Sequence, residues 1–282
     1  MKKITRRSFM AAAGLTVAAL ALTACGGSSS TASSAAASSV ASSAAASSEA
    51  ASAAATELTT VEAGKLTMAN NAAFPPYEMT TDAGEFEGID IETAQAIADK
   101  LGLELQIDDM DFDAALLSVQ QGKADIVMAG VTVTDERKAV MDFSDSYATG
   151  IQSIIVPEGS DIASPDDLTG KKIGTQRGTT GYIYCSDDFG DENVVAYDDG
   201  LTAVQALNNG QVDAVVIDNA PAQEFIAANP GLKILDTSYA EEDYAIGMAK
   251  GSSLEDAVNA ALKELKADGT LQSIVDKYIT AE

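Results

Sequence analysis

The sequence predicts an α/β protein built from two lobes that face each other across a cleft. Short apolar strands alternate with helical segments from about residue 65 to the end of the chain, a pattern typical of α/β folds with largely parallel sheets. The 218 residues of this body suffice for one large domain or two small ones. A short sequence pattern that occurs twice favours two small domains.

The expected strands are short apolar runs, and the expected helices are the longer periodic segments between them. Strands are expected at Lys65–Ala69, Glu104–Ile107, Asp125–Ala129, Gln152–Val156, Lys172–Thr175, Asn193–Tyr197, Ala214–Ile217 and Tyr244–Met248. Helices are expected at Ile91–Leu101, Ala114–Gln121, Leu201–Asn208, Ala220–Ala228, Leu254–Lys266 and Leu271–Tyr278. Residues typical of a helix N-terminus also occur at Asp135 and Thr180.

The repeated pattern joins the end of a helix to the start of an apolar strand. Residues 121–125 read Gln-Gly-Lys-Ala-Asp and residues 209–213 read Asn-Gly-Gln-Val-Asp, with Gly122 and Gly210 88 residues apart. Glycine suits the left-handed residue that stops a helix. Two lobes of similar build are therefore expected, and the cleft between two such lobes is a favoured ligand site.

The first 25 residues have the pattern of an export signal. A basic start is followed by an uncharged apolar run from Phe9 to Ala24, the length of a signal-peptide core. The run ends in Leu22-Thr23-Ala24-Cys25, which resembles the lipobox of bacterial lipoproteins. Residues 1–24 are therefore expected to be cleaved and Cys25 lipidated, the alternative being an uncleaved membrane anchor. Arg6-Arg7 also resembles a twin-arginine signal, and the export route stays open.

Residues 25–64 are expected to tether the body to the outer, extracytoplasmic face of the cell membrane. From Ser28 to Ala55 the chain is almost entirely serine and alanine, without an apolar stripe to bury. Such a segment is typical of a flexible linker.

Charge and composition exclude several classes of function. The net charge of −26 argues against binding to nucleic acid or to anionic lipid. The chain has no histidine, which excludes Ser-His and Cys-His catalysis and histidine-ligated metal sites. With Cys25 lipidated, Cys185 has no partner for a disulfide, and we interpret it as a helix residue rather than a nucleophile. No cofactor or metal is expected.

Polar side chains follow four of the expected strands at their carboxyl ends, where ligands collect in open α/β sheets. These segments are 70–78, 130–137, 176–181 and 218–221.

The motifs in these segments resemble the bacterial extracellular solute-binding proteins of family 3, which bind polar amino acids for ABC importers. The resemblance rests on Gly88-Ile89-Asp90-Ile91-Glu92, Ala129-Gly130-Val131-Thr132, Thr134-Asp135-Glu136-Arg137, Asp142-Phe143-Ser144, Gly178-Thr179-Thr180-Gly181 and Asp218. Thr93 departs from it, because the family favours an apolar residue there. The implied fold is the type II periplasmic-binding-protein fold. Its first lobe would be 65–149 plus 243–282, its second lobe 150–242, and its hinge two strands near Thr149–Ser153 and Asp243–Ile246.

The resemblance assigns roles that suit a zwitterion. Arg137 would hold the carboxylate of the ligand bidentately. Backbone N–H groups near Thr132 and Thr180, and the Thr132 hydroxyl, would add donors. Asp218 would receive the ammonium group, together with the carbonyl of Gly130.

The remaining site residues would surround the side chain of the ligand. Phe74 and Phe112 would stack on it and exclude water, and Asn71 and Gln176 would line the end of the pocket. Because several family members that bind cationic amino acids carry an acid where Asn71 stands, a polar, uncharged ligand is expected.

Each of these residues also has a structural interpretation. Arg137 could be a solvated helix residue paired with acids, and Asp218 could cap the helix that follows it. Thr132 and Thr180 could be turn residues, and Phe74 and Phe112 could belong to the core.

We therefore expect a monomeric amino-acid-binding protein that closes around its ligand and presents it to an ABC permease, without enzymatic activity. Two alternatives stay open. One is a ligand-binding sensor that serves no transporter, and the other is a cyclohexadienyl-type dehydratase on the same fold.

Overall fold

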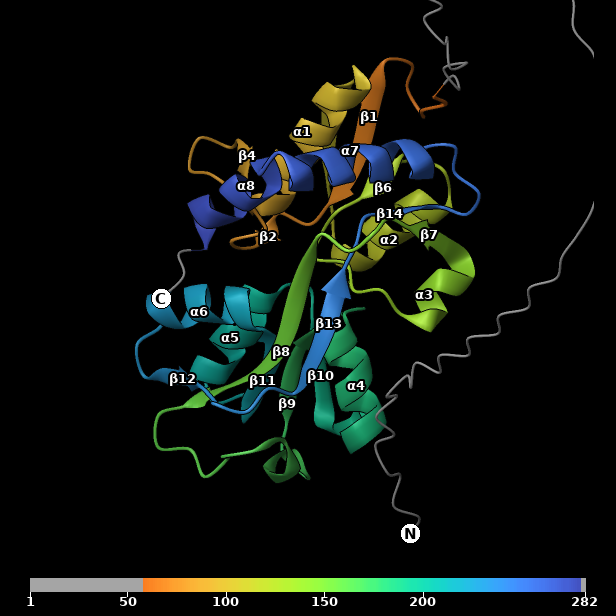
Figure 1. The fold of residues 1–282 in the computed structure, drawn as a ribbon. Helices are drawn as coiled ribbons and strands as arrows, with labels where there is room; N and C mark the ends of the chain where they lie inside the picture. The colour runs from red at the N-terminus through yellow and green to blue at the C-terminus, as the bar shows by residue number, and fades with distance from the viewer. Residues whose placement is uncertain (1–57, 280–282) are drawn as a thin grey trace, which may run out of the picture. The chain divides into compact units, whose positions relative to one another are not determined.

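Two mixed β-sheets form the framework of residues 58–279, the part of the chain that the structure, a computed structural model, describes (Figure 1). The first sheet has the strand order β5-β1-β6-β14-β7. The second has the order β10-β9-β11-β8-β12, and β13 pairs with β8. A small third sheet, β2-β3-β4, is formed by the part of the chain between β1 and α1.

The first sheet consists of β1 (Lys65–Asn70), β5 (Glu104–Asp109), β6 (Ile126–Val127), β7 (Met141–Phe143) and β14 (Gly247–Ala249). The second consists of β8 (Ala148–Pro157), β9 (Ile173–Gln176), β10 (Val194–Tyr197), β11 (Ala214–Asp218), β12 (Leu232–Ile234) and β13 (Ala240–Tyr244). The third consists of β2 (Ala73–Phe74), β3 (Glu78–Thr80) and β4 (Phe86–Glu87).

Helices cover both faces of each large sheet. On the first sheet, α1 (Ile89–Leu101), α7 (Glu255–Ala267) and α8 (Thr270–Tyr278) pack together, and α2 (Phe112–Gln120) packs on β1, β6 and β14. On the second, α5 (Gly200–Asn208) and α6 (Asn219–Ala228) pack with β8 and β11, and α4 (Thr180–Phe189) packs on β9, β10 and β11. The remaining helices are α3 (Asp135–Val140) and the 3₁₀ turns η1 (Pro165–Leu168) and η2 (Asp191–Asn193).

The expected α/β fold is confirmed, because the expected strands and helices correspond to elements of the structure with shifts of a few residues at their ends. One expected strand is wrong. Tyr244–Met248 is not a single strand, since β13 ends at Tyr244 in the second sheet and β14 begins at Gly247 in the first. All five residues are buried. Their continuous apolar pattern therefore does not reveal that the chain passes from one sheet to the other. The helices α3 and α4 begin at Asp135 and Thr180, where the sequence showed residues typical of a helix N-terminus but no helix was predicted.

The repeated helix-to-strand pattern has the same structure in both places. Gly122 and Gly210 adopt left-handed φ angles of 66° and 67°. The aspartates that follow each accept a hydrogen bond from the backbone of the neighbouring strand region. Asp125 Oδ2 accepts from Thr67 N at 2.8 Å, and Asp213 Oδ2 accepts from Lys172 N at 2.8 Å. Each aspartate thus ties the turn after a helix to an adjacent strand.

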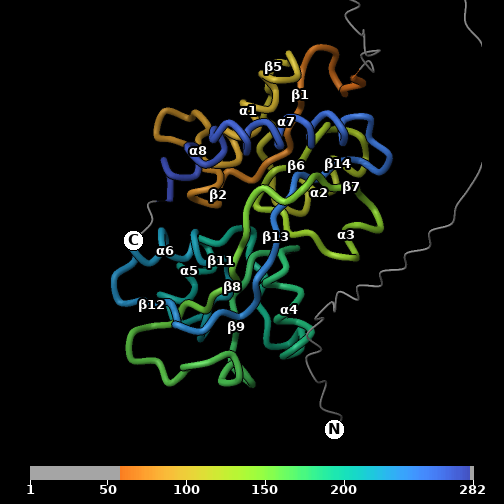
Figure 2. The backbone as a smooth tube through the Cα atoms, viewed as in Figure 1, coloured from red at the N-terminus to blue at the C-terminus, as the bar shows by residue number. Residues whose placement is uncertain are grey.

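The chain passes between the two sheets at two adjacent places. Residues 144–147 join β7 to β8, and Ala245-Ile246 join β13 to β14. The two crossings are bonded to each other, with Ser144 N donating to Ile246 O at 3.0 Å and Tyr147 N donating to Tyr244 O at 2.9 Å. Figures 1 and 2 show β8 and β13 side by side where they approach the first sheet. The first crossing thus precedes the expected hinge segment Thr149–Ser153, which lies within β8.

The expected signal peptide, Cys25 and most of the expected tether lie outside the described residues. Residues 58–64 contact the first lobe, where Val61 N donates to Asp125 Oδ1 at 2.7 Å. Within 58–279, no helix combines the length and the apolar character needed to cross a membrane.

The loop that leads into α1 depends on Gly88. Its φ of 133° is open to glycine and strained for other residues, and a Cβ here would overlap the carbonyl oxygen of Tyr77. Ile89 N and Asp90 N donate to the carbonyls of Pro76 and Tyr77 at 3.1 and 2.9 Å. Gly88 therefore allows the segment that includes Phe74 and Tyr77 to lie directly against the start of α1.

We predict that Gly88→Ala lowers the free energy of unfolding by about 1–3 kcal/mol more than Gly231→Ala does, because overpacking costs about that much. Gly231 is a matched control, since it also has a positive φ (96°) but its Cβ would meet no atom within 4 Å. Urea denaturation of both variants measures the difference. Equal losses would contradict the close packing of Tyr77 on Gly88.

Candidate ligand-binding site

A pocket lies between residues of the two large sheets and their flanking helices. It is lined by Asn71, Phe74, Glu78, Phe112, Ala129, Gly130, Thr132, Arg137, Gln176, Thr179, Thr180 and Asp218. All nine residues singled out in the sequence line it, although they come from positions up to 147 residues apart (71 to 218). Glu78, Ala129 and Thr179 were not foreseen.

Arg137 lies at the point where the two lobes meet. It is on α3, which Thr134 caps by accepting a hydrogen bond from Arg137 N at 3.2 Å. The guanidinium donates to Thr132 O at 2.7 Å and, across the cleft, to Gly178 O at 3.1 Å. Only 8% of Arg137 is exposed, so the interpretation as a solvated surface arginine is wrong.

The guanidinium keeps its charge without a carboxylate in contact. Burial lowers the pKa of Arg137, and the negative charge of Glu242 opposes that shift. None of the ion pairs among residues 58–279 involves Arg137. Its Cζ lies 5.4 Å from the centre of the Phe112 ring, which shields one face of the guanidinium. The group therefore offers N–H donors to an anion in the pocket.

The start of α4 supplies further donors. Thr179 is the N-cap residue, and its hydroxyl accepts from Tyr182 N at 3.3 Å. The first N–H groups of a helix have no partner within the helix, and anions are favoured there. Because Thr180 opens the helix and lines the pocket, its backbone N–H is placed to serve an anion beside Arg137.

The two threonine hydroxyls are committed elsewhere. Thr132 Oγ1 donates to Glu242 Oε2 at 3.1 Å, and Thr180 Oγ1 donates to the same oxygen at 2.9 Å. The Thr132 hydroxyl could therefore donate to a ligand only by giving up its hydrogen bond to Glu242.

Asp218 ends β11 and is buried at the other side of the pocket. Its side chain makes no capping bond to α6, so the cap interpretation is wrong. Instead Oδ2 accepts from Gln152 Nε2 at 2.7 Å. Burial raises the pKa of Asp218 to about 7, and the negative charge of Glu242 adds to the shift. A carboxyl group in this state favours a cation beside it.

Gly130 connects the pocket to a buried acid. Its φ is 55°, and a Cβ would lie 2.8 Å from the Phe74 ring, so only glycine fits. Its N–H donates to Asp90 Oδ2 at 3.0 Å, and the Tyr147 hydroxyl donates to the same oxygen at 2.8 Å. Burial raises the pKa of Asp90 to about 6, and these two hydrogen bonds oppose the shift. Asp90 thereby fixes the backbone at Gly130.

Glu78 is the least expected residue in the pocket. It is fully buried, and burial, with Asp90 nearby, raises its pKa well above the usual value. A protonated carboxyl is the form that such a site favours. In the sequence Glu78 follows Tyr77 in a loop of mixed polarity, which gives no sign of burial.

Two carboxamides that line the pocket are hydrogen-bonded to each other. Gln176 Nε2 donates to Asn71 Oδ1 at 2.8 Å across the cleft, and Asn71 Nδ2 donates to Met110 O at 3.0 Å. Both side chains are more than 90% buried.

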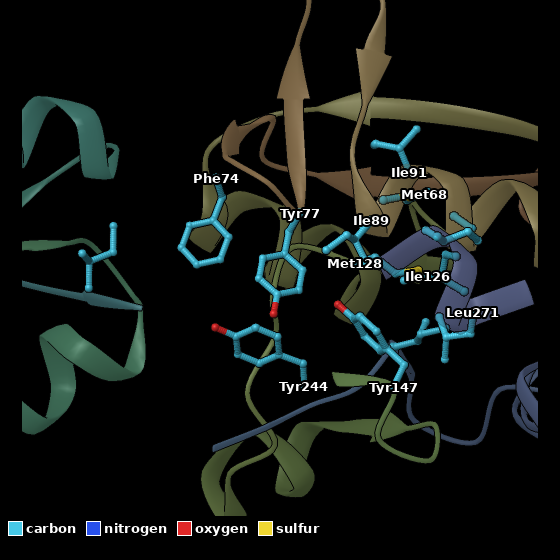
Figure 3. Packing of buried hydrophobic residues seen from close by; sticks show 14 of the residues in the cluster. Met68, Phe74, Tyr77, Ile89, Ile91, Ile126, Met128, Tyr147, Tyr244 and Leu271 are labelled. Carbon is cyan, nitrogen blue, oxygen red and sulfur yellow. The ribbon is translucent and has the colours of Figure 1, made fainter. Parts of the chain in front are cut away.

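The aromatic residues serve the pocket and the core together. Phe74 lines the pocket and packs in the main hydrophobic cluster, and Phe112 lines the pocket and packs in a second cluster. The ring of Tyr77 packs against both Phe74 and Tyr244 (Figure 3), with centroid distances of 5.9 and 5.3 Å. Both interpretations of the two phenylalanines thus hold at once.

Comparison with known proteins identifies a family. The sequence model of the bacterial extracellular solute-binding proteins, family 3, matches residues 66–281. The L-cystine-binding protein TcyJ of Escherichia coli (strain K12) is 33% identical over 226 residues, which cover 78% of this chain and 85% of that protein.

Solved structures agree with this assignment. The arginine-, lysine-, histidine-binding protein ArtJ from Geobacillus stearothermophilus is 34% identical with a TM-score of 0.74, covering 77% of this chain and 96% of that one. An ancestral arginine-binding protein bound to glutamine is 41% identical with a TM-score of 0.74, covering 78% of this chain and 100% of that one. These neighbours share the two-lobed fold.

We predict that amino-acid affinity falls as the pH is lowered from 8 to 5. The pKa of Asp218 is raised to about 7, so below that pH the carboxyl carries a proton that an incoming ammonium must displace. The dissociation constant should rise about tenfold per pH unit below 7, because one proton is released on binding. Calorimetry in two buffers of different ionisation enthalpy measures that proton. A constant affinity between pH 5 and 8 would contradict this role of Asp218.

Proposed function

Because the chain belongs to the bacterial extracellular solute-binding proteins of family 3, we infer that it captures an amino acid outside the cytoplasm and delivers it to the permease of an ABC importer. Its relatives are named for binding cystine, arginine, lysine and histidine. The neighbours found by comparison are binding proteins, which favours neither the sensor nor the dehydratase.

One observation carries this inference: Arg137 and Asp218, of opposite charge, are buried on opposite lobes and line one pocket. A free amino acid has a carboxylate and an ammonium group on neighbouring atoms. The carboxylate would take the free N–H groups of Arg137 and the start of α4, since guanidinium and carboxylate match in geometry. The ammonium would take Asp218 and the carbonyl of Gly130.

A ligand held in this way would bind the closed protein more tightly than the open one, because it contacts both lobes. Its differential affinity would then shift the population towards the closed form, which the permease would recognise. We take 65–149 plus 243–282 as one moving lobe and 150–242 as the other. The protein would act as a monomer, without catalysing a reaction.

The ligand side chain would be polar and uncharged. In the pocket, Asn71 and Gln176 offer one carboxamide each and no ionised group. A carboxamide supplies both donors and an acceptor, which suits a neutral side chain with the same groups.

The protein would work from the outer face of the membrane, attached through a lipid on Cys25. The basic start, the apolar run to Ala24 and the lipobox-like end of that run support this placement.

The binding function predicts a thermal shift with one or a few of the twenty amino acids. A ligand at one hundred times its dissociation constant should add about 2.7 kcal/mol to the stability of the purified protein. Arg137→Ala and Asp218→Ala should each abolish the shift while the protein stays folded. Arg177→Ala is the matched control, because Arg177 is exposed and its ion pair with Asp198 lies on the surface. An undiminished shift in both site variants would contradict the binding site.

The proposed contact between Asn71 and the side chain of the ligand predicts a change in specificity. Asn71→Asp should raise the affinity ratio of arginine to glutamine by at least about tenfold, because a charged hydrogen bond contributes about 1.5–3 kcal/mol. The new carboxylate would lose the bond to Met110 O, but this cost is common to both ligands and cancels in the ratio. Calorimetric titration with each amino acid measures the ratio. An unchanged ratio would show that residue 71 does not face the ligand side chain.

A further inference from the structure

Glu242 is a buried acid in a strand whose neighbours are exposed. Residues 241–243 read Glu-Glu-Asp on β13, and the alternation of the strand turns Glu241 and Asp243 to solvent and Glu242 inward. Glu242 is 7% exposed, although a charged side chain is costly to bury without partners.

A single oxygen of Glu242 collects three hydrogen bonds. Oε2 accepts from Thr132 Oγ1 at 3.1 Å, from Thr180 Oγ1 at 2.9 Å and from Gln152 Nε2 at 3.1 Å. Thr132 follows β6 of the first sheet, whereas Thr180 opens α4 on the second. The two threonine oxygens lie 3.5 Å apart. Glu242 therefore joins one hydroxyl from each lobe.

Two of the residues that donate to Glu242 are also hydrogen-bonded to the charged residues of the pocket, Arg137 and Asp218. The carbonyl of Thr132 accepts from Arg137 at 2.7 Å. The amide of Gln152 donates to Asp218 at 2.7 Å as well as to Glu242. Glu242 does not itself line the pocket, so it acts on the site through these three neighbours.

We propose that Glu242 is a positioning residue that couples the carboxylate half of the site to the ammonium half. By holding both hydroxyls, it fixes the start of α4 against Thr132 and sets the spacing of the N–H donors on either side of the cleft. By accepting a hydrogen bond from Gln152, it also fixes the amide that orients the carboxyl group of Asp218. Glu242 lies three residues before Ala245 of the second crossing, so it would bring the two halves of the site together as the lobes close. This proposal rests on the proposed function.

The variant Glu242→Gln tests it, with Glu241→Gln as the matched control. Both remove one negative charge from the same strand, but Glu241 is exposed. A carboxamide in this place keeps one acceptor oxygen but lacks the negative charge of the carboxylate, and hydrogen bonds to a neutral acceptor are roughly half as strong as those to a charged one. L-Glutamine and L-arginine are the probes, replaced by the amino acid with the largest thermal shift if neither binds the unaltered protein.

The expected result is a dissociation rate at least tenfold faster in Glu242→Gln, with the association rate within about threefold and Glu241→Gln within twofold of the unaltered protein. Stopped-flow competition measures both rates. A merely structural role would lower the melting temperature of the free protein and leave the dissociation rate of the folded fraction unchanged. That outcome overturns the proposal.

A double-mutant cycle supplies the second measurement. Thr180→Val removes one of the hydroxyls and keeps the carboxylate. If Glu242 acts through Thr180, then Thr180→Val should raise the dissociation rate in the unaltered protein but by less than twofold in the Glu242→Gln background. Independent, additive effects would overturn the proposal. If none of the twenty amino acids binds the unaltered protein, the proposed function itself fails, which separates the two conclusions.

Discussion

The site depends on a guanidinium that is taken out of water and shared between two lobes. Arg137 is anchored by one carbonyl on each side of the cleft. Carbonyls orient a guanidinium but carry no full charge, so they do not neutralise it. The nearest compensating charge is that of Glu242, which is bonded to the hydroxyls of Thr132 and Thr180 and balances the guanidinium only in part. An arginine in this position favours an anion in front of it, and the geometry of the pocket decides which anions reach it.

Around this cation the protein buries more acids than it needs for charge balance. Glu78, Asp90, Asp218 and Glu242 are all less than 9% exposed. Burial is the largest cause of the raised pKa of the first three. The cost of keeping Glu78, Asp90 and Asp218 ionised favours proton uptake by these three groups in the free protein and favours a ligand that brings a positive charge. Stability and function are thus opposed at Asp218: the group that suits an ammonium is the one that the folded protein would hold protonated up to neutral pH.

Much of the fold and of the site could be predicted from the sequence, for identifiable reasons. Strands such as Ala214–Ile217 are continuous apolar runs, and the turns at Gly122 and Gly210 need a left-handed residue, so local chemistry identifies both. The segments that contain Arg137 and Asp218 could be identified because they follow strands at the edge where ligands collect, and the resemblance to the family then assigned the two residues their roles. The residues that were missed depend on contacts distant in sequence. Glu242 differs from Glu241 and Asp243 only in the direction of its side chain, and Glu78 is buried in β3, which contacts α1. The passage from β13 to β14 was hidden because every residue from Tyr244 to Met248 is buried.

The adjacency of the two interlobe crossings has a consequence for the order in which the parts of a ligand would be recognised in the proposed closure. Two connections that lie side by side permit rotation about one axis through them and resist translation, so displacement grows with distance from that axis. Thr132 pairs with Tyr244 beside the crossings, whereas Asn71 follows β1 and Gln176 ends β9, each two strands away from the connecting strand of its sheet. In the proposed closure, Thr132 would therefore move little, and the carboxamides of Asn71 and Gln176 would move farther. An incoming molecule would be retained first by what it shares with every other amino acid and be discriminated last, at the end of the rotation.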